Sequence, residues 1–337
     1  MGIQAIERPG TFEALELPAS GVAADLKRVE ERLQEVTSSH SQLIGDVCNY
    51  LIFGGGKRIR PLLVLLCARS FRHDPEGAID VAVATELIHM ASLIHDDIID
   101  NARTRRGRAT VNSLWGNRTS VLAGDFLFAR ALTILSRMDH RNRLGLVRLM
   151  AEAITVMCEG EIEQACQAFN CDLTEADYME QIRKKTAHLM AASCYAGAVI
   201  GRASKREAGA MMRYGLELGY AFQITDDLLD FTGEERVTGK PAGLDLSSGI
   251  LTLPILHILR DARFSADIRR MLAGRRPSRD DVKTICDWVS SSGALEYARR
   301  KARHHVEAAK ACLAEMPEGP SRACLEDIAD RVLVRDR

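Results

Sequence analysis

The sequence has few of the features that mark secreted or membrane proteins. Its nine cysteines are scattered and include no C-x-x-C pair, which argues against a disulfide framework and favours free thiols in a reducing compartment. The N-terminus lacks a cationic start followed by an apolar run, and no stretch approaches the roughly 20 uncharged apolar residues of a membrane-spanning helix. These absences predict a cytoplasmic protein without a transmembrane segment.

The chain also lacks an excess of charge of either sign. Its 45 basic and 46 acidic residues give a formal net charge of -1, so the whole molecule has no general attraction for nucleic acid or acidic membranes. Aromatic residues make up only 5%, and no aromatic stacking platform accompanies the arginine clusters. We therefore expect no nucleic-acid partner, and any charge chemistry must be local.

Proline is scarce, with 9 in 337 residues, and apolar residues recur at a spacing of three to four, as in Leu87, Met90, Ala91, Ile94 and Ile98. This period is typical of amphipathic helices. The segments 174–177 and 204–207 each have a hydroxyl followed three residues later by a carboxylate, which predicts a capped helix start. No hairpin dipeptide lies between alternating strands, so the sequence predicts an all-α fold.

Segments rich in glycine and basic residues interrupt the apolar helices at 53–61, 103–112 and 233–249. We interpret them as loops that separate helices and not domains, and residues 274–280 as the start of a C-terminal helical tail. The organisation is therefore a single domain over residues 1–337, with residues 1–20 irregular and the core beginning near residue 25.

The pattern Asp-Asp-x-x-Asp occurs twice, first at Asp96, Asp97 and Asp100 and again at Asp226, Asp227 and Asp230. On a helix the first and last carboxylates of each triad lie on one face, about 6 Å apart, and repel each other unless a cation lies between them. Both triads are set among Ile and Leu, where unpaired charge is costly. Hard oxygen ligands without a His or Cys ligand pattern suit Mg²⁺ and a phosphate-bearing substrate.

The pair Asp280-Asp281 provides an internal comparison. It has no aspartate four residues later and follows a basic segment, so we interpret it as an ordinary exposed helix start.

Two basic segments provide cations for a second anion: Lys57 and Arg60 in GGGKRIRP, and Arg105 and Arg106 in TRRGR. The glycines at 54–56 allow the backbone to approach a cluster of oxygens, and guanidinium groups match the geometry of phosphate. The first segment is not a P-loop, because Lys57 is followed by Arg and the glycine spacing differs.

These motifs together resemble those of one family, the trans-type isoprenyl diphosphate synthases or polyprenyl synthetases. The segments that carry the resemblance are, in family order, GGGKRIRP, ELIHMASLIHDDIIDNARTRRGRATVN, GDFLFARAL, EGEIEQ, KKTAHL, GYAFQITDDLLDF and GKPAGLDLSSGILTLP. They extend from about residue 25 to the C-terminus, and the chain is most similar to the synthases of medium and long all-trans products.

The resemblance implies an isoprenoid-synthase-type helical bundle around a central cavity, with the two aspartate triads facing each other across its mouth, and a homodimer. It implies that Asp96, Asp100 and Asp226 are direct Mg²⁺ ligands, with three ions per active site. Asp97, Asp227 and Asp230 are then in supporting positions.

The same resemblance assigns the substrate contacts. Residues implied to bind the allylic diphosphate, and so to serve catalysis, are Arg105, Lys185, Thr186, Gln223 and Lys240. Residues implied to bind isopentenyl diphosphate are Lys57, Arg60, His89 and Arg106. One position departs from the pattern: many relatives have Lys where this chain has Ile250, so a further cation at the allylic phosphate is missing. We expect a change in affinity and not a loss of activity.

The implied activity is Mg²⁺-dependent condensation of isopentenyl diphosphate with an allylic diphosphate. In the family, bulky aromatics four or five residues before the first aspartate limit product length. This chain has Ala91 and Ser92 there, so we expect a product longer than fifteen carbons, in the octaprenyl-like range, that is passed to a membrane enzyme. Phe126, Phe128 and Leu132 are alternative floors of the product tunnel. The allylic primer and the pathway stay open.

Three other functions are compatible with parts of the pattern. A metal-dependent phosphohydrolase could use His95 and Asp96, but it leaves the second triad and Lys57 unexplained. A non-catalytic subunit of a heteromeric synthase typically lacks one triad, whereas both are intact here. A terpene cyclase would not need a second diphosphate site.

Overall fold

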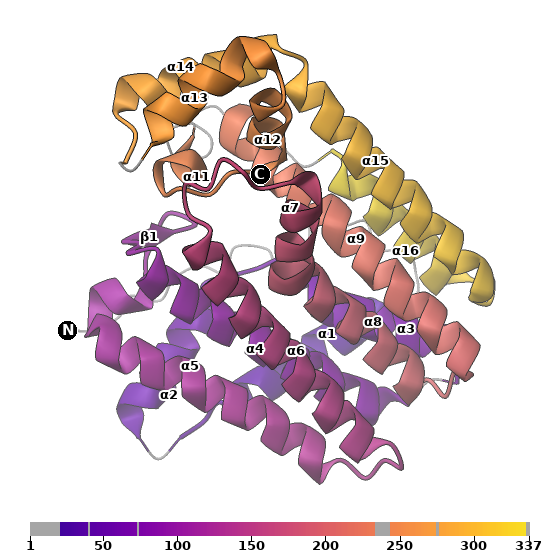
Figure 1. The fold of residues 1–337 in the computed structure, drawn as a ribbon. Coiled ribbons are helices and arrows are strands. Elements are labelled where there is room, and N and C mark those ends of the chain that lie inside the picture. The colour runs from indigo at the N-terminus through magenta and orange to yellow at the C-terminus, as the bar shows by residue number, and fades with distance from the viewer. Residues whose placement is uncertain (1–20, 40, 73, 233–242, 274–275, 335–337) are drawn as a thin grey trace. The chain divides into compact units, whose positions relative to one another are not determined.

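The computed structural model describes residues 21–39, 41–72, 74–232, 243–273 and 276–334 of the chain. Within these residues the secondary structure is helical apart from one short hairpin (Figure 1). The all-α prediction is therefore confirmed. The chain divides into two compact units. Unit 1 comprises Met1–Ala151, Ser193–Gly209 and Pro317–Leu325, and unit 2 comprises Glu152–Ala192, Ala210–Met316 and Glu326–Arg337.

The helices and strands that lie wholly in unit 1 come from the first part of the chain. They are α1 (Val22–Val36), α2 (Gln42–Ile52), α3 (Ile59–Arg69), α4 (Pro75–Ile99), β1 (Thr104–Arg105), β2 (Arg108–Ala109) and α5 (Val111–Arg137). Four helices pass from one unit to the other, namely α6 (Arg143–Cys166), α8 (His188–Ile200), α9 (Lys205–Thr232) and α16 (Pro320–Val332).

Helix α4 is the central element of unit 1. Asp74 caps its first turn by accepting a hydrogen bond from the backbone N–H of Gly77, and Pro75 occupies a first-turn position where no N–H is needed. From Val81 to Ile88 every residue is buried, because α4 packs against α1, α3 and above all α5. Because this stretch is buried on all sides, α4 is the scaffold from which the carboxylates near its C-terminal end project.

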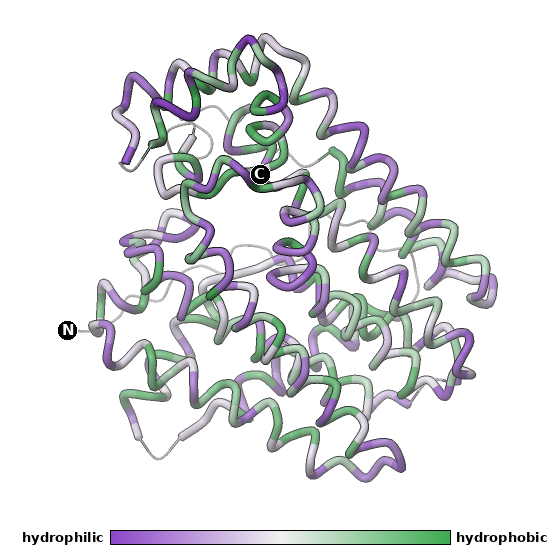
Figure 2. The backbone as a smooth tube through the Cα atoms, viewed as in Figure 1, coloured by the Kyte–Doolittle hydropathy of each residue, from purple (hydrophilic) through white to green (hydrophobic). Residues whose placement is uncertain are grey.

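Unit 2 contains the remaining helices. They are α7 (Glu175–Ile182), the π-helical turn η1 (Arg183–Ala187), α11 (Leu244–Ser247), α12 (Leu253–Leu259), α13 (Ala262–Leu272), α14 (Arg279–Ser291), α15 (Ala294–Cys312) and the 3₁₀ turn η2 (Leu313–Glu315). Helix α12 is apolar and contacts α7, α13, α14 and α15. Along α15, Ala294, Ala298 and Ala302 are buried at helical spacing, and hydrophilic residues alternate with them (Figure 2).

The predicted helix starts are present in the structure. Thr174 and Asp177 form a capping box at α7, and Ser204 and Glu207 exchange the equivalent hydrogen bonds before α9. The comparison pair is also as expected, because Ser278 and Asp281 form a capping box at the start of α14. Asp281 thus serves as a helix cap, and Asp280 is an acidic residue of the first turn, where negative charge is favourable.

The expectation of an irregular loop at 103–112 is wrong in one respect. Thr104 pairs with Ala109, and Arg105 pairs with Arg108, to form a two-stranded antiparallel hairpin. Its two turn residues, Arg106 and Gly107, have φ of 51° and 73°, the left-handed values of a tight hairpin turn. Each strand has only two residues. This is too short to show an alternating pattern of apolar and polar residues in the sequence.

Two described helices, α4 and α5, are long and apolar enough to cross a membrane by length and composition, although both carry charged residues, such as Glu86 in α4 and Arg130 in α5. The most apolar part of α4 is 72% buried within the protein, as in a core helix, whereas that of α5 is 39% buried. Helix α5 therefore exposes apolar surface that unit 1 does not cover.

Candidate functional site

The loop between α2 and α3 carries Lys57 and Arg60 of the predicted diphosphate site. Gly55 has φ of 76°, and Arg58, the residue before α3, has φ of 44°, so the chain turns through two left-handed conformations. Lys57 between them is exposed. Arg106 of the hairpin reaches this loop, and its Nη1 donates a hydrogen bond of 2.7 Å to the carbonyl oxygen of Gly55. The two basic segments are therefore adjacent in unit 1.

Arg58 differs from its neighbours in being buried, with only 3% of its side chain exposed. Its Nε donates to Glu30 over 2.6 Å and its Nη1 to Glu86 over 2.8 Å, while Nη2 donates to the carbonyl of Ile52 over 3.0 Å. Burial opposes the charge of Arg58, but the two carboxylates outweigh it, so its pKa lies above the usual value. The sequence provides no sign of this pairing.

His89 lies on α4 among the arginines of both segments. Burial, followed by the charges of Arg60, Arg106 and Arg105, holds the pKa of His89 well below its ordinary value. Burial and the neighbouring Arg105 also lower the pKa of Arg106. Several like charges held in a partly buried place are unfavourable without a counter-anion. Unit 1 thus brings the predicted residues Arg60, His89 and Arg106 together at a place suited to an anion.

The first aspartate triad ends α4, and its members have different surroundings. Asp97 is buried and accepts a hydrogen bond of 2.7 Å from Nε of Arg105. Asp96 is half-buried, and Asp100, the residue that follows the helix, is exposed. Arg105, assigned to the allylic diphosphate, therefore pairs with the supporting aspartate, and Asp96 and Asp100 are the accessible carboxylates.

His95 contacts α5. A Cβ atom at Gly124 would lie 2.2 Å from Nε2 of His95, so only glycine permits this approach. The same Nε2 lies 3.2 Å from the carbonyl oxygen of Val121, in hydrogen-bonding distance. This contact does not bear on the phosphohydrolase alternative, because a histidine that binds a metal commonly donates its other ring nitrogen to a backbone carbonyl.

The residues assigned to product length are not equivalent. Ala91 is completely buried, whereas Ser92 is half-buried and donates its hydroxyl to the carbonyl of His89 over 2.9 Å. Of the alternative floors on α5, Phe126, Phe128 and Leu132 are all half-buried. Ser92 is therefore the more accessible of the two α4 positions.

The second triad lies on α9 in unit 2, and its middle member is again the buried one. Asp227 accepts hydrogen bonds from the hydroxyl of Tyr178, at 2.7 Å, and from Nε2 of Gln223, at 2.8 Å. Burial and the negative charge of Asp245 raise the pKa of Asp227 to about 8, although these two hydrogen bonds oppose the shift. Asp226 is exposed.

Asp230, the last member, holds a backbone segment. Its two carboxylate oxygens accept hydrogen bonds from the N–H groups of Leu244 and Asp245, over 3.1 and 3.3 Å, at the first turn of α11. This turn brings Asp245 into electrostatic range of Asp227. Tyr178 and Asp245 thus belong to this cluster, although the sequence motifs did not predict a role for either. The sequence signal for Asp245 was its position in the segment GKPAGLDLSSG.

Lys185 and Thr186, which the sequence assigns to the allylic diphosphate, lie in η1, a π-helical turn of the kind that is frequent at functional sites. The hydroxyl of Thr186 donates to Oε1 of Gln223 over 2.6 Å, and Nζ of Lys185 lies 2.8 Å from Glu161. A Cβ at Gly219 would lie 2.4 Å from the Cα of Ala187, so this glycine is needed for α9 to approach η1. Lys240 lies outside the described residues.

No group of three metal-binding side chains occurs among the residues that the structure describes. Mg²⁺ usually takes one or two carboxylates and completes its shell with water and substrate phosphate. Asp96, Asp100 and Asp226 offer accessible carboxylate oxygens of that kind.

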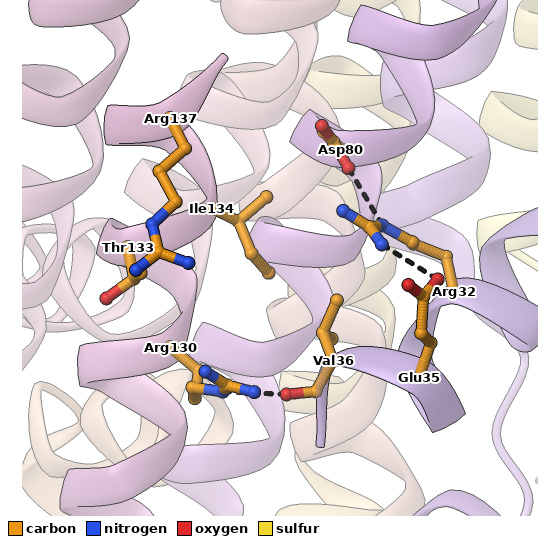
Figure 3. Close-up of a pocket in the computed structure, with 8 residues that line it drawn as sticks. All are labelled: Arg32, Glu35, Val36, Asp80, Arg130, Thr133, Ile134 and Arg137. Carbon is orange, nitrogen blue, oxygen red and sulfur yellow. Dashed lines mark hydrogen bonds and ion pairs between the residues drawn. The ribbon is translucent and has the colours of Figure 1, made fainter. Parts of the chain in front are cut away.

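A separate pocket of about 250 Å³ lies among α1, α4 and α5 of unit 1 (Figure 3). Although it contains arginines, two of them are engaged in the fold: Arg32 pairs with Asp80 and Glu35, and Arg130 donates to the carbonyl of Val36. None of the predicted site residues lines it. We interpret it as a packing defect between helices and not as the active site.

A helical protein with paired aspartates and convergent arginines has the features of a metal-dependent enzyme that acts on diphosphates. The family model of polyprenyl synthetase matches residues 41–289. The chain is 39% identical over 317 residues to heptaprenyl diphosphate synthase component 2 of Geobacillus stearothermophilus, covering 94% of this chain and 98% of that protein. It is 34% identical over 316 residues to octaprenyl diphosphate synthase of Escherichia coli K12, covering 94% and 97%.

Solved structures agree with the sequence comparison. A decaprenyl diphosphate synthase from Rhodobacter capsulatus superposes with a TM-score of 0.88 at 37% identity, covering 95% of this chain and 98% of that chain. A polyprenyl synthase from Caulobacter crescentus CB15, solved with calcium and isoprenyl diphosphate, has a TM-score of 0.88 at 36% identity, covering 94% and 96%. The chain belongs to the polyprenyl synthetase family and is a prenyltransferase.

The lowered pKa of His89 predicts a pH dependence of stability. Below about pH 6.5 the unfolded chain binds a proton at this histidine while the folded protein does not, so the free energy of unfolding falls as the pH falls. The variant His89→Gln should lose this contribution, worth about 1 kcal/mol one pH unit below the unfolded pKa. Urea unfolding at several pH values measures it. The exposed His304→Gln is the control and should behave as wild type; equal pH dependence of His89→Gln and wild type would contradict the prediction.

Proposed function

We propose that the protein joins isopentenyl diphosphate head to tail to an allylic diphosphate and makes an all-trans polyprenyl diphosphate longer than fifteen carbons, in the octaprenyl-like range. The observation that carries this proposal is the convergence of arginines around His89, close in the chain to the accessible carboxylates that end α4. Relatives named heptaprenyl, octaprenyl and decaprenyl diphosphate synthase support the product class.

We assign isopentenyl diphosphate to unit 1, with Lys57, Arg60, His89 and Arg106 as its ligands. Guanidinium groups offer paired N–H donors that match phosphate oxygens. A neutral His89 adds a hydrogen-bond donor without adding charge, in keeping with its lowered pKa. The glycines of the loop allow backbone N–H groups to approach the same oxygens.

We assign the allylic diphosphate to Arg105, Lys185, Thr186, Gln223 and Lys240. In the structure Lys185 and Arg105 are paired with carboxylates, so binding a diphosphate exchanges one anion for another without leaving either cation unpaired. The hydroxyl of Thr186 donates to Gln223, which leaves the lone pairs of its oxygen to face a developing carbocation.

Mg²⁺ held by Asp96, Asp100 and Asp226 would supply neutralisation of the departing diphosphate; three ions per site is the number that the resemblance implies. The Caulobacter structure with calcium and isoprenyl diphosphate supports a site for a divalent cation and a diphosphate. Asp97 and Asp227, which are buried and hydrogen-bonded, would hold the neighbouring residues in place.

The proposed chemistry requires no side-chain nucleophile. The allylic C–O bond breaks, and its electron pair leaves with diphosphate, whose charge Lys185 and Arg105 help to stabilise. The double bond of isopentenyl diphosphate then forms the new C–C bond, and the proton lost from the adjacent carbon passes to the released diphosphate. Oriented oxygen dipoles of Thr186 and Gln223 stabilise the intermediate carbocation.

Removal of one accessible aspartate tests the assignment. Asp96→Ala and Asp226→Ala should each lower turnover about a hundredfold or more, since they remove charge that acts on the transition state. The assay measures labelled isopentenyl diphosphate incorporated with Mg²⁺ and primers of several lengths, and sizing of the products gives the chain length. Asp280→Ala, at an exposed helix start, should retain wild-type turnover. Near-normal rates in the first two variants, with circular dichroism unchanged, would sink the assignment.

Small side chains on α4 are the proposed basis of the long product. Ala91 and Ser92 both leave room where relatives with short products have aromatics, and Ser92 is the accessible one. A phenylalanine at the fully buried Ala91 would strain the core as well as block a tunnel. The cleaner substitution is therefore at Ser92.

We expect Ser92→Phe to shorten the main product by at least one isoprene unit, because the ring fills space needed by the growing chain. Chromatography of the dephosphorylated products measures the change. Ser92→Ala, which removes the hydroxyl without adding volume, should keep the wild-type product. An unchanged product from Ser92→Phe would move the tunnel away from this face of α4.

We also propose a homodimer in the cytoplasm. Helix α5 exposes Leu114, Val121 and Leu122 by 50%, 42% and 59%, and large exposed apolar groups on one helix are typical of a surface that another chain covers. Light scattering should give twice the mass of one chain. A monomer that needs an added subunit for activity would instead favour a heteromeric enzyme. The Geobacillus relative is named as one component of its synthase, which is why this alternative is tested.

A further inference from the structure

The turn that carries Lys57 and Arg60 has an unusual conformation for its sequence. Arg58 adopts φ of 44° and ψ of 38° immediately before α3, a left-handed conformation that side chains with a Cβ rarely adopt. Such a conformation persists only where surrounding contacts determine it. The contacts of the Arg58 side chain are therefore the place to look for what shapes this loop.

Those contacts join three helices of unit 1. Glu30 belongs to α1, Glu86 to α4, and Ile52 is the last residue of α2, and the guanidinium group of Arg58 donates to all three. Four of its hydrogen bonds are accounted for, counting a second, longer one to Glu30 at 3.4 Å. With a side chain 3% exposed, Arg58 is directed into the unit while Lys57 beside it is exposed.

The same guanidinium group adjoins the cations of the proposed diphosphate site. A Cβ at Gly56 would lie 3.1 Å from Nη1 of Arg106 and 3.4 Å from Nη1 of Arg58, so both groups lie against this glycine. Arg58 carries positive charge into a region that already holds Arg60 and Arg106, and Glu30 and Glu86 neutralise it. Arg58 can therefore hold the backbone of this region in place without adding net positive charge to it.

We propose that Arg58 is a positioning residue: by clamping Glu30, Glu86 and the end of α2, it holds the left-handed turn that presents Lys57 and Arg60 to isopentenyl diphosphate. This inference rests on the proposed function and deepens it. Arg58 does not contact substrate; it acts through its two basic neighbours, and Glu86 is part of the same device.

The test separates positioning from plain structural support. Arg58→Met removes the clamp, and Arg69→Met is its matched control, because Arg69 is the last residue of α3, the helix that Arg58 precedes, and pairs with Asp25 of α1 as Arg58 pairs with Glu30. Both variants should lower the thermal midpoint. Only Arg58→Met should raise the KM for isopentenyl diphosphate, by about tenfold or more, since small misplacements of binding groups have large effects. Its KM for the allylic diphosphate should change less than about twofold.

Two further variants keep the proposal testable if Arg58→Met is too unstable to assay. Arg58→Lys keeps the charge but replaces the three separate guanidinium nitrogens with a single ammonium group, and Glu86→Gln keeps the volume and leaves Glu30 as a carboxylate. Each should raise the KM for isopentenyl diphosphate selectively, to a smaller extent. A KM within twofold of wild type in all Arg58 and Glu86 variants overturns the proposal, as does an equal rise for both substrates that Arg69→Met reproduces. Absence of condensation by the wild-type protein would overturn the proposed function itself.

Discussion

Charged groups carried on apolar helices must be paired, and this requirement organises the protein. Helix α4 is buried along most of its length, and its last turns carry three carboxylates. Taking a charge out of water without a partner costs far more than one helix contributes to stability. The buried carboxylates Asp97 and Glu86 of this helix therefore have guanidinium partners outside it, Arg105 for Asp97 and Arg58 for Glu86. The hairpin and the loop before α3 are thereby fastened to the helix that carries the site.

Helix geometry makes each aspartate triad serve two purposes. Residues four apart share a face, but the residue in between, one position after the first, points about 100° away. The middle carboxylate of each triad consequently turns into the protein, as Asp97 and Asp227 do, while Asp96 and Asp226 stay accessible. The basic loop follows the same division, with Arg58 inward and Lys57 outward. In each case a buried charge next to an exposed one fixes the backbone from which the exposed group projects.

Much of this protein could be predicted from its residues. Helical periodicity, the capping signals at Thr174 and Ser204, and the family motifs were sufficient for the fold class and the reaction class, because these depend on patterns within short segments. The hairpin at 104–109 and the π-helical turn at Lys185 could not be read, since two-residue strands and a single widened helical turn leave no periodic signal. Tyr178 and Asp245 were missed because their roles depend on contacts with Asp227, 49 residues away in the chain for Tyr178.

The sequence by itself determined which chemistry is available: two carboxylate triads for a divalent cation, two basic segments for phosphate, and apolar helices to carry them. These follow from side-chain type and spacing along a helix. Only the tertiary structure decided which of those groups are exposed and which are consumed in pairing. That choice depends on which helices lie side by side, because a carboxylate that is buried against a guanidinium becomes part of the scaffold, as Asp97 does with Arg105.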